Sequence, residues 1–268
     1  MSTSARAQIF PRDMSAGSMV LSISIAGFTL EVRSPLDFLS VMEVFAFDVY
    51  RRAYIRSGDR VLDLGAGIGE FTVLASKLVG VKGVVVAVEP SPEDFAILTR
   101  NVRTNGCKNV RLVQAGAGQV DGEARRVVFR ERSFDFVSRS IESIMKECGI
   151  PRIDFVKMDI EGQERLVVPA SLDRLAGARA IAAELHGDQR ESTRLLEERG
   201  FSFHPVTSKG TWRNLVMFTL RHPVSSVRLY SLVRPVIGHS ILFSMKEDLA
   251  IARDPNLVVG VFERRFRD

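Results

Sequence analysis

The stretch VLDLGAGIGEF, residues 61–71, constrains the fold of this chain more than any other feature. An apolar run that includes Asp63 is followed by glycines at alternate positions, Gly65, Gly67 and Gly69, and then by apolar residues at helical spacing. A buried strand that passes through a glycine turn into a helix is typical of the first βα unit of an open parallel sheet. Ligands of such sheets bind at the carboxyl ends of the strands, so the glycines mark a candidate binding site.

The rest of the chain repeats this alternation. We predict strands at 60–64, 83–88, 110–114, 123–129, 153–158, 178–185, 201–206 and 256–266, and helices at 69–79, 92–105, 139–148, 163–175 and 189–199. A hairpin over 19–33 and a helix over 36–54 precede them. This order predicts an α/β protein with a Rossmann-like, doubly wound, mostly parallel seven-stranded sheet, in which 123–129 is an extra strand. We expect residues 1–18 to form a flexible tail and residues 19–268 to form one domain.

Residues 207–255 are predicted to be a basic helical insertion before the last strand. The basic residues there are Lys209, Arg213, Arg221, Arg228, Arg234, Lys246 and Arg253, against the acidic Glu247, Asp248 and Asp254. We favour helices over 211–252, broken at Pro223 and Pro235, although the pattern at 211–221 also fits a strand. Two interpretations stay open: a helical cap with a solvated basic face, or a surface for an anionic acceptor or for lipid head groups.

Composition and cysteine usage narrow the class of protein. The chain is 46% hydrophobic and 26% charged, which suits a globular core. Its apolar runs are too short and too often charged to span a bilayer, and no apolar signal core follows the N-terminus. The two cysteines, Cys107 and Cys148, support neither a disulfide nor a metal site. We expect a cytoplasmic protein, with contact at a membrane surface as the alternative.

The spacing of the glycines narrows the ligand. It reads D-x-G-x-G-x-G rather than the G-x-G-x-x-G of nicotinamide and flavin sites, and no phosphate-loop Lys-Ser/Thr follows. Asp63 suits an ammonium group, and Glu89 at the end of the next strand suits the two hydroxyls of a ribose. S-adenosylmethionine, an amino acid joined to a nucleoside, fits both ends. The alternatives are an empty turn or another nucleotide.

With this glycine spacing, and with Asp63 and Glu89 at the two strand ends, the chain resembles the class I methyltransferases and, more narrowly, the FkbM family. The resemblance covers about residues 43–203 and includes SGDRVLDLGAGIGEFTVLAS, VVVAVEPSPEDFAILTRNVRTNG, NVRLVQAGAGQVDGE, IDFVKMDIEGQERLV and AIAAELHG. The DIEG and ExH pieces, in that order, are typical of this family. The resemblance implies S-adenosylmethionine as cofactor and methyl transfer to oxygen, usually to a hydroxyl of a sugar or a secondary metabolite.

Four ionisable residues end two later strands: Asp159 and Glu161 in KMDIEG, and Glu184 and His186 in AAELHG. In a doubly wound sheet these ends flank the glycine loop. A hydroxyl acceptor must lose its proton at or before methyl transfer, so we take His186 as the first candidate base and Asp159 as the second. Glu161 has an alternative role at a helix N-terminus, and His186 and Glu184 have structural alternatives. The four side chains also suit a divalent metal, but nothing in their spacing requires one.

The third strand end is predicted to lie near the adenine, with Gln114 or the backbone of Ala115 in contact with the ring. The preferred function is O-methylation of a hydroxyl on a glycan, glycolipid or small metabolite. The first alternative is a tRNA or rRNA methyltransferase, because the sequence pI is about 9.5. Against it, the Asn/Asp-Pro-Pro-aromatic motif of base methylation is missing, and Cys148 precedes the fourth strand. The second alternative, a non-catalytic binding module, conflicts with the intact glycines and Glu89.

Overall fold

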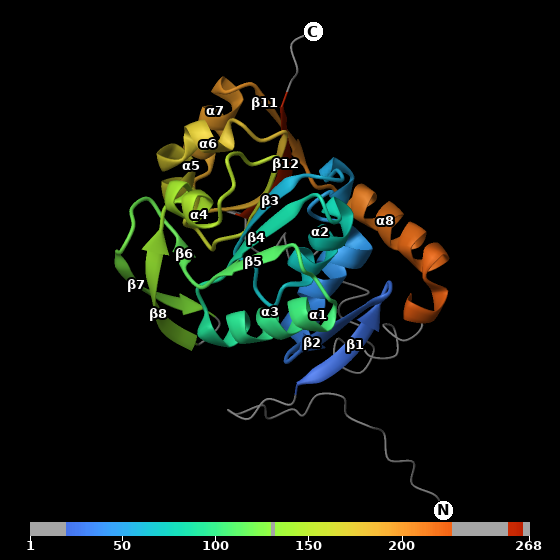
Figure 1. Cartoon of the computed structure of the whole chain (residues 1–268). Coiled ribbons are helices and arrows are strands. Elements are labelled where there is room, and N and C mark those ends of the chain that lie inside the picture. Colours follow the sequence, from blue (N-terminus) through green and yellow to red (C-terminus); the bar gives the residue numbers. More distant parts are fainter. Residues whose placement is uncertain (1–19, 130–131, 227–256, 265–268) are drawn as a thin grey trace, which may run out of the picture.

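A seven-stranded sheet forms the centre of the molecule, in a computed structural model that describes residues 20–129, 132–226 and 257–264 (Figure 1). Its strands, in spatial order, are β11 (Phe201–Pro205), β12 (Leu257–Arg264), β10 (Ala180–His186), β9 (Phe155–Met158), β3 (Arg60–Leu64), β4 (Val84–Val88) and β5 (Val110–Val113). The predicted last strand, β12, is antiparallel to both of its neighbours, whereas the pairs among β10, β9, β3, β4 and β5 are parallel. The predicted mostly parallel sheet is therefore confirmed.

The strand order reverses direction beside β3. The chain passes from β3 to β4 and β5 on one side, and later from β9 to β10 on the other. The gap between the ends of β3 and β9 is therefore the topological switch point, where ligands of open α/β sheets bind. The glycine loop follows β3, and Asp159 follows β9, so the fold brings these two parts of the sequence together.

Helices cover both faces of the sheet. The core on one face contains residues of α2 (Glu70–Val79) and α3 (Pro92–Thr104), and the core on the other contains residues of α4 (Ile141–Glu147), α5 (Glu164–Ala170) and α7 (Arg190–Glu198). Val61 belongs to the first core and its neighbour Leu62 to the second, because successive side chains of a strand point to opposite faces. The predicted helix 163–175 is interrupted at Ser171, after which the short α6 (Leu172–Leu175) begins.

The N-terminal hairpin is confirmed as β1 (Leu21–Ile25) and β2 (Phe28–Val32), but the helix predicted over 36–54 is wrong in its second half. Helix α1 (Pro35–Met42) runs into a π-helical turn, Glu43–Phe47, and Asp48 then takes a left-handed conformation with φ 53°. The Asp48 carboxylate accepts hydrogen bonds from the backbone N–H and the Nε of Arg52, which stabilises the turn. This turn places Tyr50 inside the protein rather than on a helix.

A small three-stranded sheet flanks the main one, in the order β6 (Gly116–Ala117), β8 (Arg132–Arg139) and β7 (Ala124–Phe129). The extra strand predicted at 123–129 is confirmed as β7. Its partner β8 was not predicted, and the helix predicted from residue 139 begins later, at Ile141.

Residues 211–221 are helical, which resolves the choice that the sequence left open. Helix α8 (Ser208–Arg221) ends just before His222 and Pro223, and it packs on the Glu43–Phe47 turn, where Asn214 Nδ2 donates to the Phe47 carbonyl at 2.8 Å. The predicted break at Pro235 and the rest of the insertion up to residue 256 lie outside the described residues. No helix among the described residues is long and apolar enough to cross a membrane.

Candidate active site

The three glycines after β3 all have positive φ, but they have different surroundings. A Cβ on Gly65 would lie 1.8 Å from the Asp159 carbonyl oxygen, and one on Gly69 would lie 2.5 Å from Leu98 Cδ1. A Cβ on Gly67 would meet nothing closer than the Glu70 carboxylate at 4.0 Å. Gly65 and Gly69 therefore permit close packing within the protein, and Gly67 is the glycine of the three that borders open space.

Glu89, at the end of β4, lies directly against this loop. Its Oε2 accepts the Gly67 N–H at 2.8 Å, and its Oε1 accepts the Ser91 N–H at 2.8 Å. The side chain is buried, and burial raises the pKa of its carboxyl to about 8. Each carboxylate oxygen has a second lone pair, so Glu89 retains the capacity to accept hydrogen bonds from a ligand.

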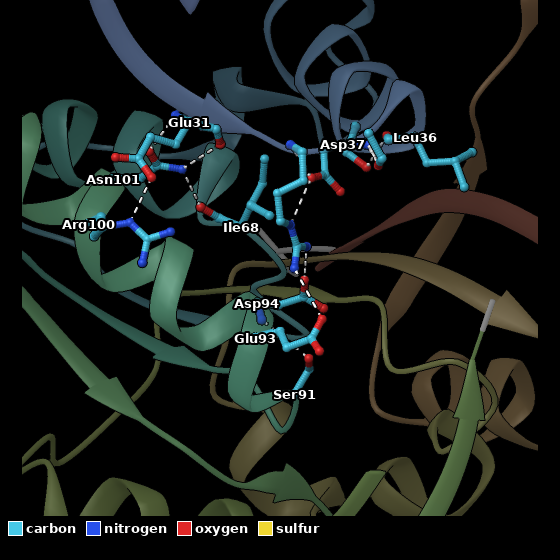
Figure 2. Close-up of polar contacts among 12 residues, drawn as sticks. Glu31, Leu36, Asp37, Ile68, Ser91, Glu93, Asp94, Arg100 and Asn101 are labelled. Carbon is cyan, nitrogen blue, oxygen red and sulfur yellow. Dashed lines mark hydrogen bonds and ion pairs between the residues drawn. The ribbon is translucent and has the colours of Figure 1, made fainter. Parts of the chain in front are cut away.

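The N-terminal hairpin and α3 hold the glycine loop in place (Figure 2). The fully buried Asn101 donates to the Ile68 carbonyl at 2.8 Å and accepts the Glu31 N–H at 2.7 Å. Arg33 pairs with Asp37, Nε to Oδ2 at 3.2 Å, and also with Asp94 in α3. The loop, the hairpin and α3 therefore form one hydrogen-bonded unit.

Asp63 has no exposed surface, because neighbouring side chains enclose its carboxylate. Thr72 donates to its Oδ2 at 2.5 Å, and Lys157 Nζ lies 3.5 Å from its Oδ1. Burial raises the pKa of Asp63, and Lys157 opposes that shift. Lys157, a residue of this chain, therefore places an ammonium group beside Asp63.

Lys157 connects the glycine loop to the end of β9, and sequence reasoning missed it. Its Nζ donates to the Gly65 carbonyl and lies 3.7 Å from Asp159 Oδ2. Burial opposes its ionisation, but the surrounding carboxylates of Asp63, Asp159, Glu70 and Glu184 raise its pKa. Lys157 is therefore a buried cation held by carboxylates on both sides of the switch point.

Asp159, Glu184 and His186 converge at the carboxyl ends of β9 and β10, as the sequence predicted. One ligand-type atom from each lies within 4.8 Å of the others. The Tyr50 hydroxyl donates to Glu184 Oε1 at 2.8 Å and lies 3.3 Å from Asp159 Oδ2. Burial and the charge of Asp159 raise the pKa of Glu184 to about 8. Two carboxylates, an imidazole and a phenol thus share one corner of the site.

His186 lies between two carboxylates, which sets its charge. Its Nδ1 is 3.4 Å from Glu164 Oε1, and its Nε2 is 3.4 Å from Glu161 Oε2. Burial lowers the pKa of the imidazole, but the hydrogen bond and charge of Glu164 and the charge of Glu161 outweigh burial and raise it to about 9. In this arrangement the ring is cationic at neutral pH, which argues against His186 as the first candidate base and favours the second, Asp159.

Glu161 occupies an unusual backbone position. Its φ is 53° and that of Gly162 is 90°, so two left-handed residues follow β9 in succession. Helix α5 begins three residues later, at Glu164. Glu161 is therefore outside the first turn of the helix, and its Oε2 lies 3.4 Å from His186 Nε2.

The predicted adenine contacts follow β5. Gln114 is exposed and Ala115 is buried, and they directly follow Val113, whose carbonyl accepts the Glu89 N–H at 3.1 Å. This places them at the same sheet edge as the ribose candidate, one strand further from the Asp159 cluster.

Sequence reasoning also missed Glu70, Tyr50 and Glu164. Glu70 follows the last glycine, is buried, and has an oxygen, Oε2, without a hydrogen-bond partner among the described residues; burial raises its pKa to about 8. An acid directly after the glycines is a signal that could have been used. Tyr50 offered no signal, because the predicted helix continued through it.

Comparisons with known proteins match the chain to methyltransferases. Residues 63–203, more than half of the chain, match the model of the methyltransferase FkbM domain. Among curated proteins, the chain is 36% identical over 108 residues to the 23S rRNA (uracil(1939)-C(5))-methyltransferase RlmD of Acinetobacter baumannii strain SDF, over 38% of this chain and 22% of that protein. It is 39% identical over 69 residues to protein-L-isoaspartate O-methyltransferase 1 of Archaeoglobus fulgidus, over 26% of this chain and 32% of that protein.

The chain thus aligns with about a fifth to a third of the length of these relatives. Among solved structures, M. jannaschii TYW2 in complex with AdoMet matches with a TM-score of 0.45 and 15% identity, over 94% of this chain and 90% of that one.

Proposed function

The chain belongs to the FkbM methyltransferase family, and from that premise we propose that it is an S-adenosylmethionine-dependent O-methyltransferase. The proposed acceptor is a hydroxyl of a glycan, a glycolipid or a small metabolite. The observation that carries the proposal is the position of Gly67. A Cβ on Gly67 would meet nothing closer than the Glu70 carboxylate, and the Gly67 N–H donates to Glu89. Asp159, Glu184 and His186 converge at the same switch point.

The residues around Gly67 fit a cofactor that has an amino acid at one end and a nucleoside at the other. Glu89 is placed to accept the ribose hydroxyls, with Gln114 and Ala115 beside it for the adenine. Glu70, buried with an unpartnered oxygen, is the better candidate for the ammonium group, because Asp63 is already paired with Lys157. When bound, S-adenosylmethionine supplies a methyl group that is activated by a sulfonium charge.

The polar corner would orient the acceptor and take its proton. Tyr50 holds Glu184 and Asp159 in fixed positions through its hydroxyl, so their remaining lone pairs can accept a hydrogen bond from a substrate O–H. Asp159 is the preferred proton acceptor, since His186 already carries a proton at neutral pH in this arrangement. Phe71 packs edge-on against the Tyr50 ring at 5.5 Å, which supports the phenol from its apolar side.

Calorimetric titration with S-adenosylmethionine and, separately, with NAD tests the cofactor. We expect saturable binding of the first alone, and binding of NAD alone or of neither compound would refute the proposal. Release of S-adenosylhomocysteine in the presence of a panel of sugars, lipid-linked sugars and hydroxylated metabolites then tests the acceptor class.

A second candidate function is RNA methylation, which the aligned segment of the 23S rRNA methyltransferase favours. The basic sequence pI of about 9.5 is compatible with it. Against it, β9 is followed by Asp159-Ile160-Glu161-Gly162, and the buried Cys148 directly follows α4, before β9. RNA binding that persists at physiological salt, together with methyl transfer to RNA and to none of the hydroxylated compounds, would favour this second function.

A further inference from the structure

We propose that Asp159, Glu184 and His186 form a binding site for one divalent first-row metal ion. Their ligand-type atoms all lie within 4.8 Å of one another. Atoms that bind one such ion at about 2.1 Å are separated by roughly 3–4 Å, so small side-chain adjustments bring the three residues into range. Two carboxylates with one imidazole suit ions such as Mn²⁺ and Zn²⁺, which accept both oxygen and nitrogen ligands.

Each of the two carboxylates keeps an oxygen for such an ion. The Tyr50 hydroxyl contacts Oδ2 of Asp159 and Oε1 of Glu184, and Lys157 Nζ also approaches Oδ2 of Asp159. The contacts within the described part of the chain thus hold each side chain by one oxygen. Oδ1 of Asp159 and Oε2 of Glu184 are left for a further ligand. Tyr50 and Lys157 then act as positioning residues that fix the two metal ligands.

The surroundings of His186 provide an independent observation. Glu164 is 2% exposed, and its Oε1 lies 3.4 Å from His186 Nδ1. A buried carboxylate on Nδ1 orients the imidazole, as in carboxylate–histidine–metal arrangements. The other nitrogen, Nε2, faces Glu161 Oε2 at 3.4 Å, so an ion at Nε2 would displace the ring proton and bring its own positive charge next to Glu161. The second oxygen of Glu164, Oε2, has no hydrogen-bond partner among the described residues. The contacts of this buried carboxylate are made by Oε1, with His186 and with the Ile160 N–H.

The proposed metal site adjoins the candidate cofactor loop. The backbone carbonyl of Asp159 packs where a Cβ of Gly65 would lie, and Lys157 bridges the Gly65 carbonyl and the Asp159 carboxylate. An ion held by Asp159 is therefore fixed relative to the loop that borders Gly67. This adjacency is what a reaction between a cofactor and a metal-bound acceptor requires.

The chemical role of the ion rests on the proposed O-methylation, although ion binding does not. Three protein ligands leave coordination positions for the oxygen of an acceptor hydroxyl. A bound ion would lower the pKa of that hydroxyl, so its proton would pass to solvent water and the electron pair would stay on the oxygen. That oxygen would then take the methyl group while the bond between the methyl carbon and the sulfonium sulfur breaks, which leaves S-adenosylhomocysteine. With the ion bound, Asp159 would act as a metal ligand and would not need to accept the proton itself.

Metal binding is tested with the purified chain, without cofactor or acceptor. After chelator treatment, Mn²⁺ is added and followed by loss of the electron paramagnetic resonance signal of the free ion, and Zn²⁺ is titrated by calorimetry. The variants are Asp159→Asn and the half-exposed His186→Ala, each checked for folding by thermal unfolding. The matched control is Asp188→Asn, which removes an exposed acid two residues from His186 that pairs with Arg190 at 3.2 Å.

We expect the wild-type chain to bind one equivalent of ion. The affinity for the ion should fall at least tenfold in Asp159→Asn and His186→Ala, and it should stay within twofold of wild type in the control Asp188→Asn. Absence of saturable binding for both ions, or equal losses in His186→Ala and the control, would overturn the inference. A separate titration with S-adenosylmethionine distinguishes the two proposals. Cofactor binding without ion binding removes the metal site alone, and ion binding without cofactor binding removes the methyltransferase proposal alone.

Discussion

The three glycines after β3 should respond differently to the same substitution. Gly67→Ala places a methyl group on the open side of the loop, where the nearest atoms are 4.0 Å away, so the fold can accept it. Its stability cost comes from the backbone alone, since an alanine at φ 55° costs about 1–2 kcal/mol. We expect the affinity for S-adenosylmethionine to fall at least tenfold, which corresponds to about 1.4 kcal/mol of binding free energy.

Gly65→Ala should damage the fold instead. Its Cβ would lie 1.8 Å from the Asp159 carbonyl oxygen, which is backbone and has no rotamer to change. Overpacking of this kind costs about 1–3 kcal/mol, and the left-handed backbone adds to it. The end of β9 has to move, so the variant should unfold at clearly lower urea concentration than Gly67→Ala.

Gly106→Ala is the matched control. Gly106 has φ 62°, close to the 55° of Gly67, with nothing within 4 Å of an added Cβ, and it lies outside the candidate site, after α3. Urea unfolding of the three variants should give similar small losses for Gly67→Ala and Gly106→Ala. Of these two variants, only Gly67→Ala should show weakened cofactor binding in calorimetry. Wild-type affinity in Gly67→Ala would refute the assignment of the loop, and wild-type stability in Gly65→Ala would refute the packing argument.

Three further predictions concern single side chains. Asn101→Ala leaves the Ile68 carbonyl without its donor at 2.8 Å, so urea unfolding should show a loss of about 1–3 kcal/mol, and cofactor affinity should fall with it. Tyr50→Phe removes the hydroxyl that donates to Glu184 at 2.8 Å, so turnover should fall while calorimetry shows unchanged cofactor affinity. Burial raises the pKa of Glu70 in the folded chain from 4.5 to about 8, so the folded state binds the proton more tightly. The protonated Glu70 carboxyl therefore contributes its full stabilisation below pH 4.5, and this contribution is lost as the pH rises to 8. The free energy of unfolding should fall by at most about 1.4 kcal/mol per pH unit over this range. The variant Glu70→Gln should reduce this pH dependence, as measured by urea unfolding.

The convergence of Asp159, Glu184 and His186 could be predicted because it follows from topology. Each residue stands at or just after the carboxyl end of a parallel strand, and β9 and β10 are neighbours in the sheet. The spacing of apolar residues and of glycines in the sequence was enough to locate these strand ends to within two residues. The charge of His186 was not predictable, because it depends on Glu161 and Glu164 facing the ring from the β9–α5 connection.

Tyr50 could not be predicted because a local turn decides its position. The apolar spacing of 36–54 fits one long helix, and nothing in that pattern shows where the helix ends. In the structure Arg52 donates to the Val44 and Phe45 carbonyls, and Asp48 bonds Arg52 in return. These hydrogen bonds of Arg52 end the helix and turn Tyr50 inward. A side-chain contact between Arg52 and Val44, eight residues apart, thus overrides the helical spacing of the apolar residues.

Strand register explains why the sequence alone did not reveal the partner of Asp63. The sequence places an acid before the glycines and says nothing of which residue on the adjacent strand lies opposite. The structure pairs Asp63 with Lys157 across β3 and β9, so the positive partner comes from the protein. Lys157 stands among apolar residues in FVKM, which predicts burial but not the carboxylate that compensates its charge.

The charge balance around Lys157 bears on what the site can bind. Asp63, Glu70, Asp159 and Glu184 all act on this one lysine, so four carboxyl groups share one buried ammonium. Burial and neighbouring carboxylates, Asp63 for Glu70 and Asp159 for Glu184, raise the pKa values of these two groups, and Lys157 only partly opposes the shifts. A ligand that brings positive charge relieves this imbalance, as the sulfonium and ammonium groups of S-adenosylmethionine or a divalent ion would. A pyrophosphate, as in NAD, would add negative charge to the same corner, so electrostatics as well as glycine spacing favours the methyl donor.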